Sequence, residues 1–354
     1  MSENFVLNKK VMSDAYWKIW NDEVQAEIDE KIEKNRKADG TFCTTATPGS
    51  EVKVEQLTHE FKFGAHIFNF NQLGNHEYNE TYKSSYGEGG LFNSATVAFY
   101  WDKYEPTHGA TRAYGEYWDS EEYWNSLPRE EAMLRFNWRR PAPGPVIDFC
   151  KERNIRVHGH VLIWGNMRPK WIWNQYAPEN EKLKIEQWGD ERDDLENNAL
   201  GEMAPVYAAN YRNLFRQRVE GVAAAFGDTV DSWDVVNESS TDWALYHQSR
   251  TGYAFYNSPR YGIITGDYPL HALEDAQAAL PAWTKLNIND YNIVEDYQRQ
   301  IKDLLRENVR IDIVGMQMHI FDINQSRSLA EGATVLWRST SARRTSSAAP
   351  RCPI

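Results

Sequence analysis

The hydrophobic positions of this chain gather in six short, nearly continuous runs that are separated by polar or helical stretches. The runs cover residues 61–68, 91–101, 155–164, 230–237, 285–290 and 311–320. Apolar runs of this length are typical of strands that are buried on both faces, as they are in parallel sheets. The pattern therefore predicts six core strands.

Helical patterns lie between several of these runs, most clearly over residues 145–153, 206–226 and 294–308. Strands that alternate with helices favour a parallel sheet, either a β/α barrel or a doubly wound sheet. No glycine-rich phosphate loop follows a predicted strand, which argues against the nucleotide-binding doubly wound sheet. The expected fold is α/β, a (β/α)8 TIM barrel of which about six of the eight units are present.

The stretch before the first predicted strand has its own pattern. Apolar side chains from Trp20 to Ile32 recur at four-residue spacing, which predicts an amphipathic helix. Val52 and Val54 alternate with charged residues, which indicates a strand. The chain accordingly divides into an N-terminal helix and strand extension, an incomplete barrel and a basic tail, at residues 1–55, 56–331 and 332–354.

Charge and composition exclude several classes of function. Lys and Arg number 39 against 51 Asp and Glu, and the net charge of -12 argues against nucleic acid as a partner. The sequence has no run of about 18 apolar residues that would span a membrane. Three cysteines, Cys43, Cys150 and Cys352, are too few and too scattered for a disulfide framework or a structural zinc site. The first residues lack the apolar core of a secretory signal, so a cytoplasmic location is expected for the chain as written.

Aromatic side chains make up 13% of the chain, with 14 Trp and 19 Tyr, and many lie in polar stretches. An indole or phenol ring can stack on the apolar face of a sugar while its N–H or O–H makes a hydrogen bond. Packing beneath long loops explains the same residues equally well. The aromatic content is thus compatible with a carbohydrate site without requiring one.

Polar side chains stand at the predicted carboxyl ends of strands, where a β/α barrel places its chemistry. They are His160 with Trp164, Asn237 with Glu238, Asp290, and Gln317 with His319. In the sequence SWDVVNE, a buried strand ends in an amide and a carboxylic acid. A carboxyl that is partly shielded from water can protonate the oxygen of a leaving group, and the preceding Asn can hold a hydroxyl of the reacting unit. A helix-capping pair at an ordinary strand exit is the simpler alternative.

Four segments in this order resemble glycoside hydrolase family 10, a family of retaining endo-β-1,4-xylanases built on a TIM barrel. They are GHVLIW at residues 159–164 with PKW at 169–171, WDVVNE at 233–238, LNINDYN at 286–292 and GMQMH at 315–319. The resemblance covers roughly residues 61–325. It implies a β-1,4-linked polysaccharide or oligosaccharide as the substrate, with no cofactor and no metal.

The resemblance also implies a role for each matching side chain. Glu238 would be the general acid/base, and Asn237 would bind the 2-hydroxyl of the sugar being cleaved. His160 and Trp164 would line the same subsite. After its second strand, the family has polar residues that contact the neighbouring sugar. This chain has AFYWD there, so Trp101 is expected to contact the substrate.

The nucleophile of the family, a second glutamate on the seventh strand, has no counterpart in this sequence. Gln317 and His319 would orient it and the sugar next to it. A retaining enzyme needs that carboxylate about 5–5.5 Å from the acid/base. After His319 the acidic residues are Asp322 and Glu331, and neither lies in a strand pattern.

The tail over residues 332–354 is rich in Ser, Thr, Ala and Arg and contains no acidic residue. This composition differs from the acidic chain before it and indicates a truncated or frameshifted coding sequence. On this hypothesis the natural protein continues past Gly332 with two further β/α units, because six strands alone would leave the edges of an incomplete barrel open.

Two other functions stay open on the residues alone. His158 and His160 lie two positions apart on a strand, as paired zinc ligands can, and Asp290 or His319 would complete the site of a metal-dependent hydrolase. The second alternative is a non-catalytic carbohydrate-binding protein, which keeps the cleft and its aromatic residues but lacks the nucleophile.

Overall fold

The computed structural model describes the chain over residues 21–39, 43, 45–55, 59–128, 130, 140–188, 204–248, 253–254, 264–293 and 295–318. The chain divides into two compact units, Met1–Glu60 and Phe61–Ile354. Within the described ranges, none of the helices is long and apolar enough to cross a membrane.

The described part of the first unit contains the helix α2 (Asp22–Arg36). Asn21 caps this helix, because its side chain accepts a hydrogen bond from the N–H of Val24 at 3.0 Å. The strand expected near Val52 and Val54 does not form: residues 51–55 have no regular structure, and the two side chains are 51% and 58% exposed. Two valines in three residues offer too small an apolar face to hold a strand that has no partner.

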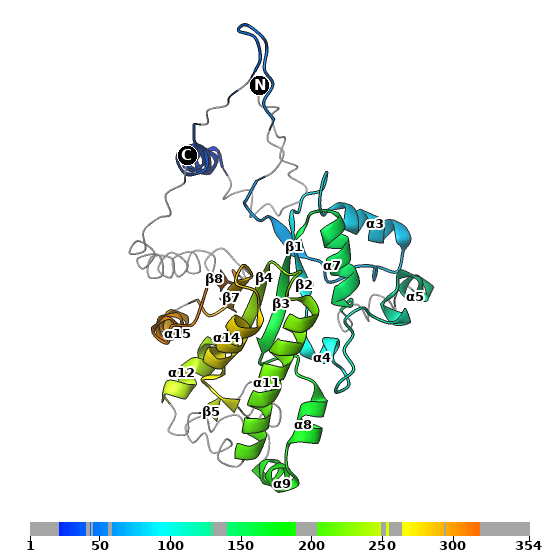
Figure 1. Cartoon of the computed structure of the whole chain (residues 1–354), viewed down its shortest axis with the longest axis vertical. Coiled ribbons are helices and arrows are strands. Elements are labelled where there is room, and N and C mark those ends of the chain that lie inside the picture. The colour runs from blue at the N-terminus through cyan, green and yellow to red at the C-terminus, as the bar shows by residue number, and fades with distance from the viewer. Residues whose placement is uncertain are drawn as a thin grey trace. The chain divides into compact units, whose positions relative to one another are not determined.

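The second unit is built on a six-stranded parallel sheet (Figure 1). Its strands are β1 (Gly64–His66), β2 (Ser94–Ala98), β3 (Arg156–Trp164), β4 (Ser232–Asn237), β7 (Lys285–Asp290) and β8 (Ile313–Met316). They pair in chain order, β1-β2-β3-β4-β7-β8, as successive strands do around a β/α barrel. Each strand falls inside one of the six predicted runs, so the predicted parallel barrel sheet is confirmed for these strands.

Three predicted helices are present, as α7 (Pro143–Glu152), α11 (Pro205–Phe226) and α15 (Glu295–Arg306). These three join the predicted N-terminal helix, α2, whereas α14 (Tyr268–Ala279), which packs on β4 and β7, was not predicted. The remaining described elements are α3 (His76–Ser84), α4 (Trp101–Tyr104), a 3-10 turn η1 (Tyr117–Asp119), α5 (Glu121–Ser126), α8 (Lys170–Tyr176), α9 (Glu179–Trp188), α12 (Ser240–Gln248) and the antiparallel pair β5 (Tyr253–Ala254) and β6 (Ile264–Thr265).

Large apolar side chains fill the layer between the sheet and α11. Trp233 of β4 lies against Phe99, with ring centroids 4.6 Å apart, and Phe99 lies against Phe226 of α11 at 5.3 Å. Gly159 of β3 leaves room for the indole, since a Cβ there would lie 2.2 Å from the Trp233 ring. Because side chains alternate along a strand, the residues next to Gly159 and Trp233 face the opposite side of the sheet, where polar groups gather.

Candidate active site

The carboxylate of Glu238 follows β4 and is held by side chains from two other strand ends. The indole Nε1 of Trp164, at the end of β3, donates a hydrogen bond to Glu238 Oε2 at 3.1 Å. The amide Nε2 of Gln317, directly after β8, donates to Oε1 at 3.1 Å. Each carboxylate oxygen therefore has a donor, and the half-buried side chain is held in one orientation.

The backbone of Glu238 adopts the left-handed conformation, with φ at 57°. Few residues other than glycine, asparagine and aspartate adopt it, and such a conformation costs on the order of 1–3 kcal/mol. The N–H of Glu238 donates to the carbonyl of Asn289 at 2.7 Å, so the neighbouring strand fixes this turn. The strand thus ends in a sharp turn that carries the carboxylate.

Asn237 is buried beside Glu238, and its side-chain oxygen accepts two hydrogen bonds. Oδ1 accepts from Asn289 Nδ2 at 2.7 Å and from Gln317 Nε2 at 2.9 Å. These two donors fix which way the amide points, since an oxygen must face them. Within the described residues the Nδ2 group of Asn237 has no protein partner. It is a donor that a sugar hydroxyl can use.

Asp234 of β4 lies beneath this group and holds two histidine rings. Its Oδ2 lies 2.6 Å from His160 Nδ1 and 3.2 Å from His158 Nε2, and its Oδ1 accepts from Asn287. Burial disfavours the charged form, but the two histidines outweigh it and hold the pKa of Asp234 well below its usual range. Because a carboxylate can only accept, His160 Nδ1 carries the proton, which leaves Nε2 of that ring for a ligand.

Aromatic rings and one guanidinium lie beside His160 and Trp164. The Tyr100 ring centroid lies 5.5 Å from that of His160 and 5.6 Å from that of Trp164. The guanidinium of Arg140 lies 4.7 Å from the Phe68 centroid and 5.6 Å from the Tyr100 centroid. Burial raises the pKa of the Tyr100 hydroxyl, which stays protonated at neutral pH. These rings offer a flat apolar surface, and the guanidinium of Arg140 places a positive charge next to it.

Asp290, at the end of β7, turns toward the backbone. Its carboxylate accepts from the N–H of Ser240 at 2.9 Å and from the N–H of Asn292 at 2.8 Å. Burial raises its pKa. The metal-ligand role considered for Asp290 alongside His158 and His160 is not supported by this arrangement, because its oxygens fix the loops after β4 and β7 while the histidines bind Asp234.

The structure brings together five of the seven residues predicted for the site. Glu238, Trp164, Gln317 and Asn237 share direct hydrogen bonds. His160 joins them through its ring, whose centroid lies 6.1 Å from that of Trp164. Their roles in substrate binding stay predictions.

The other two residues are placed differently. Trp101 belongs to α4, and its indole packs 5.9 Å from Phe215 of α11 and donates to Glu105 Oε2 at 2.9 Å. It lies on the α11 side of the sheet, and none of its described contacts is with the Glu238 group. His319 lies outside the described residues, as do Asp322 and Glu331.

Sequence reasoning missed several groups that shape this site. Asp234 and Asn287 had a detectable pattern, because polar residues on an inward strand position next to predicted site residues are unusual in a core. Tyr100 lies in the AFYWD segment that was expected near the substrate, from which only Trp101 was named, and Arg140 had no such signal. Arg140 lies 40 positions after Tyr100 in the chain, and no periodicity predicts that their side chains meet.

A family model described as glycosyl hydrolase family 10 matches residues 55–338 of this chain. The chain belongs to glycosyl hydrolase family 10. This confirms the family that the four sequence segments resemble, and all four segments lie inside the matched range.

Individual family 10 relatives match over part of their length. Endo-1,4-beta-xylanase A of Halalkalibacterium halodurans is 28% identical over 215 residues, which cover 56% of this chain and 47% of that protein. Endo-1,4-beta-xylanase A of Thermotoga maritima is 32% identical over 196 residues, covering 54% of this chain and 15% of that protein. Among solved structures, an endo-1,4-beta-xylanase from Caldicellulosiruptor owensensis matches with a TM-score of 0.48 and 20% identity, covering 80% of this chain and 67% of that one. The chain spans about half the length of the first of these relatives.

Proposed function

We propose that this chain provides the acid/base side of a retaining glycosidase that cleaves β-1,4-linked xylan, with Glu238 as the general acid/base. The observation that carries the proposal is the carboxylate of Glu238 held between the N–H groups of Trp164 and Gln317. Membership of family 10 and the names of the curated relatives, which are endo-1,4-beta-xylanases, support the substrate class.

The geometry suggests how each group acts on a bound chain. Protonated Glu238 gives its proton to the glycosidic oxygen as the bond breaks, and the carboxylate then takes a proton from the water that completes hydrolysis. The Nδ2 group of Asn237 donates to the 2-hydroxyl of the sugar being cleaved, and Nε2 of His160 meets a neighbouring hydroxyl. Tyr100 and Trp164 stack against the apolar faces of the rings.

Retention requires a second carboxylate that attacks the anomeric carbon about 5–5.5 Å from the acid/base. In the described part of the chain, three buried carboxylates in this region are already engaged: Asp234 by histidines, Asp290 by backbone N–H groups and Asp242 by the hydroxyl of Tyr268. They are not free to act as the nucleophile. The nucleophile is therefore the part of the proposed mechanism that these residues do not supply.

Substitution of the proposed acid tests the function directly. Glu238→Gln should lower kcat/KM on xylan, which reports the bond-breaking step, at least 100-fold, because general acid catalysis contributes on the order of 10²–10⁴. The same variant should lose much less on an aryl xylobioside with a strongly acidic phenol, since that leaving group needs no proton. Equal losses on both substrates would contradict the role of Glu238 as the acid.

The carbohydrate-binding alternative makes a different prediction in the same experiment. The unmodified chain would bind xylohexaose, as measured by calorimetry, and release no reducing ends on long incubation. The hydrogen-bonded amide of Asn237 and the ring of His160 would explain such binding without a nucleophile. Release of reducing ends that is lost in Glu238→Gln would reject this alternative.

A further inference from the structure

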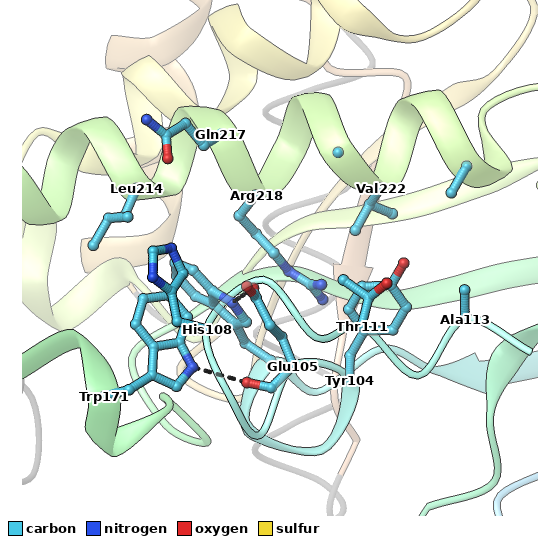
Figure 2. Close-up of a pocket in the computed structure, with 13 residues that line it drawn as sticks. Tyr104, Glu105, His108, Thr111, Ala113, Trp171, Leu214, Gln217, Arg218 and Val222 are labelled. Carbon is cyan, nitrogen blue, oxygen red and sulfur yellow. Dashed lines mark hydrogen bonds between the residues drawn. The ribbon is translucent and has the colours of Figure 1, made fainter. Parts of the chain in front are cut away.

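A second pocket lies on the other side of the sheet from Glu238. It is about 270 Å³ in volume and is bounded by α4 with the loop after it, by α8 and by α11 (Figure 2). Trp101, Tyr104 and Trp171 supply aromatic walls, and Arg218 extends from α11 toward Tyr104. None of its lining residues belongs to the Glu238 group.

Arg218 is a buried cation with most of its hydrogen-bonding capacity unused. Arg218 is only 4% exposed. Its Nη2 donates a hydrogen bond to the carbonyl of Phe99. Nε and Nη1 have no hydrogen-bond partner among the described residues. The guanidinium lies 4.7 Å from the Tyr104 centroid and 5.8 Å from the Trp101 centroid. Burial lowers its pKa to about 10, so the group is still charged at neutral pH.

The carboxylate in the pocket is committed to other donors. Glu105 Oε2 accepts from Trp101 Nε1 at 2.9 Å, and Oε1 accepts from the N–H of Gly109 at 2.7 Å. In the described structure Arg218 forms no ion pair, whereas Arg112, also nearly buried, is paired with Asp119. A buried charge is costly unless an opposite charge and hydrogen bonds compensate it. Glu105 still favours the charged form of Arg218, but two N–H groups of the guanidinium lack an acceptor, so the pocket has room for a further acceptor and donors to hold it.

We propose that this pocket binds a small ring-bearing carboxylate, whose anionic group meets Arg218 and whose ring lies between the aromatic walls. Charge-assisted bonds from a guanidinium to a carboxylate are among the stronger hydrogen bonds in proteins, and aromatic rings provide the flat apolar contact that a six-membered ring can match. The volume suits one ring and excludes a chain of several sugar units. Uronic acids and aromatic acids share this chemistry.

Calorimetric titration of the full chain with D-glucuronate and with benzoate tests the proposal, with D-glucose and benzyl alcohol as neutral counterparts. At least one carboxylate should bind with a dissociation constant on the order of 1 mM or lower, as expected for a ligand of about ten heavy atoms, and its neutral counterpart at least tenfold more weakly. Binding of glucuronate alone would identify a uronic acid as the ligand, and binding of benzoate alone an aromatic acid. Equal binding of the neutral compounds, or no binding at all, would overturn the proposal.

Three variants test whether the measured binding takes place in this pocket. Arg218→Gln should weaken it at least tenfold. Gly221→Phe should block it while retaining the guanidinium, because Gly221 lines the pocket and a Cβ there meets no atom within 4 Å. Arg216→Gln removes an exposed charge from the same helix and should change nothing. Retained binding in Gly221→Phe, or an equal loss in Arg216→Gln, would overturn the assignment, and unchanged circular dichroism shows that each variant is folded.

Discussion

Glu238 is half-buried and Arg218 is buried, and the protein satisfies their hydrogen-bonding groups to different extents. Each oxygen of Glu238 accepts a hydrogen bond from a side chain of another strand end. Arg218 gives one hydrogen bond to a backbone carbonyl and keeps two N–H groups without a described partner. The first arrangement fixes the orientation of the proposed acid/base, and the second leaves N–H donors that have no acceptor among the described residues.

The largest effect should follow from removing the anion beneath the Glu238 group. Asp234→Ala leaves His158, His160 and Asn287 without their shared partner, and breaking such a buried network costs about 3–5 kcal/mol of unfolding free energy. Urea unfolding at pH 7 measures this loss. Asp234→Asn keeps the shape and should lose less, so equal losses would show that the charge accounts for nearly the whole effect.

Asp234 also makes the unfolding free energy depend on pH. The pKa of Asp234 is lower in the folded chain than the value of about 3.9 expected when unfolded, so its carboxylate stabilises the fold at neutral pH. That stabilisation is lost as the pH falls below about 4 toward the folded pKa. In Asp234→Asn the unfolding free energy should fall less steeply over this acidic range than in the unmodified chain.

In the second pocket, removal of a charged side chain is expected to raise the unfolding free energy and not to lower it. Arg218→Met replaces a buried cation that has two unpaired N–H groups by an apolar side chain of similar length, and should raise the unfolding free energy by about 1 kcal/mol in the absence of ligand. Arg216→Met, on the exposed face of α11, is the control and should stay within about 0.5 kcal/mol. A clear loss of stability in Arg218→Met would show that the Phe99 carbonyl and the two rings already satisfy the guanidinium.

The smallest change in structure tests the donors around Glu238. Trp164→Phe removes the N–H that bonds Oε2 and keeps a ring, so kcat on xylan should fall about tenfold while the melting temperature hardly changes. Trp118→Phe, which changes an exposed ring, is a suitable control. Trp124→Phe is a poorer one because that indole is fully buried. An unchanged kcat in Trp164→Phe would mean that Gln317 alone positions the carboxylate.

Much of the fold could be predicted because strands buried on both faces have a distinctive sequence pattern. The six runs located the six strands, but their limits were less accurate. The first run covered residues 61–68, whereas β1 pairs with β2 only from Gly64 to His66, and Phe61 and Phe63 are 62% and 47% exposed. Hydrophobicity shows that a segment contains a strand, and the pairing decides where that strand stops.

The candidate site was predictable where it depends on strand ends and unpredictable where it depends on loops. Trp164, Asn237 and Gln317 stand at or just after the ends of strands, and parallel strands bring those ends together. Trp101 was expected near them because the resemblance places the segment after the second strand against the neighbouring sugar. The chain turns into α4 at that residue, which directs the indole toward α11 instead.

The short segment after β2 belongs to both sites at once. The carbonyl of Phe99 accepts from Arg218, the ring of Tyr100 lies beside His160 and Trp164, and the ring of Trp101 lines the second pocket. Three consecutive residues thus separate the two proposed binding sites. Thermodynamic linkage makes any communication between them symmetric: if a carboxylate in the pocket changes the affinity for xylohexaose by some factor, the oligosaccharide must change the affinity for the carboxylate by the same factor.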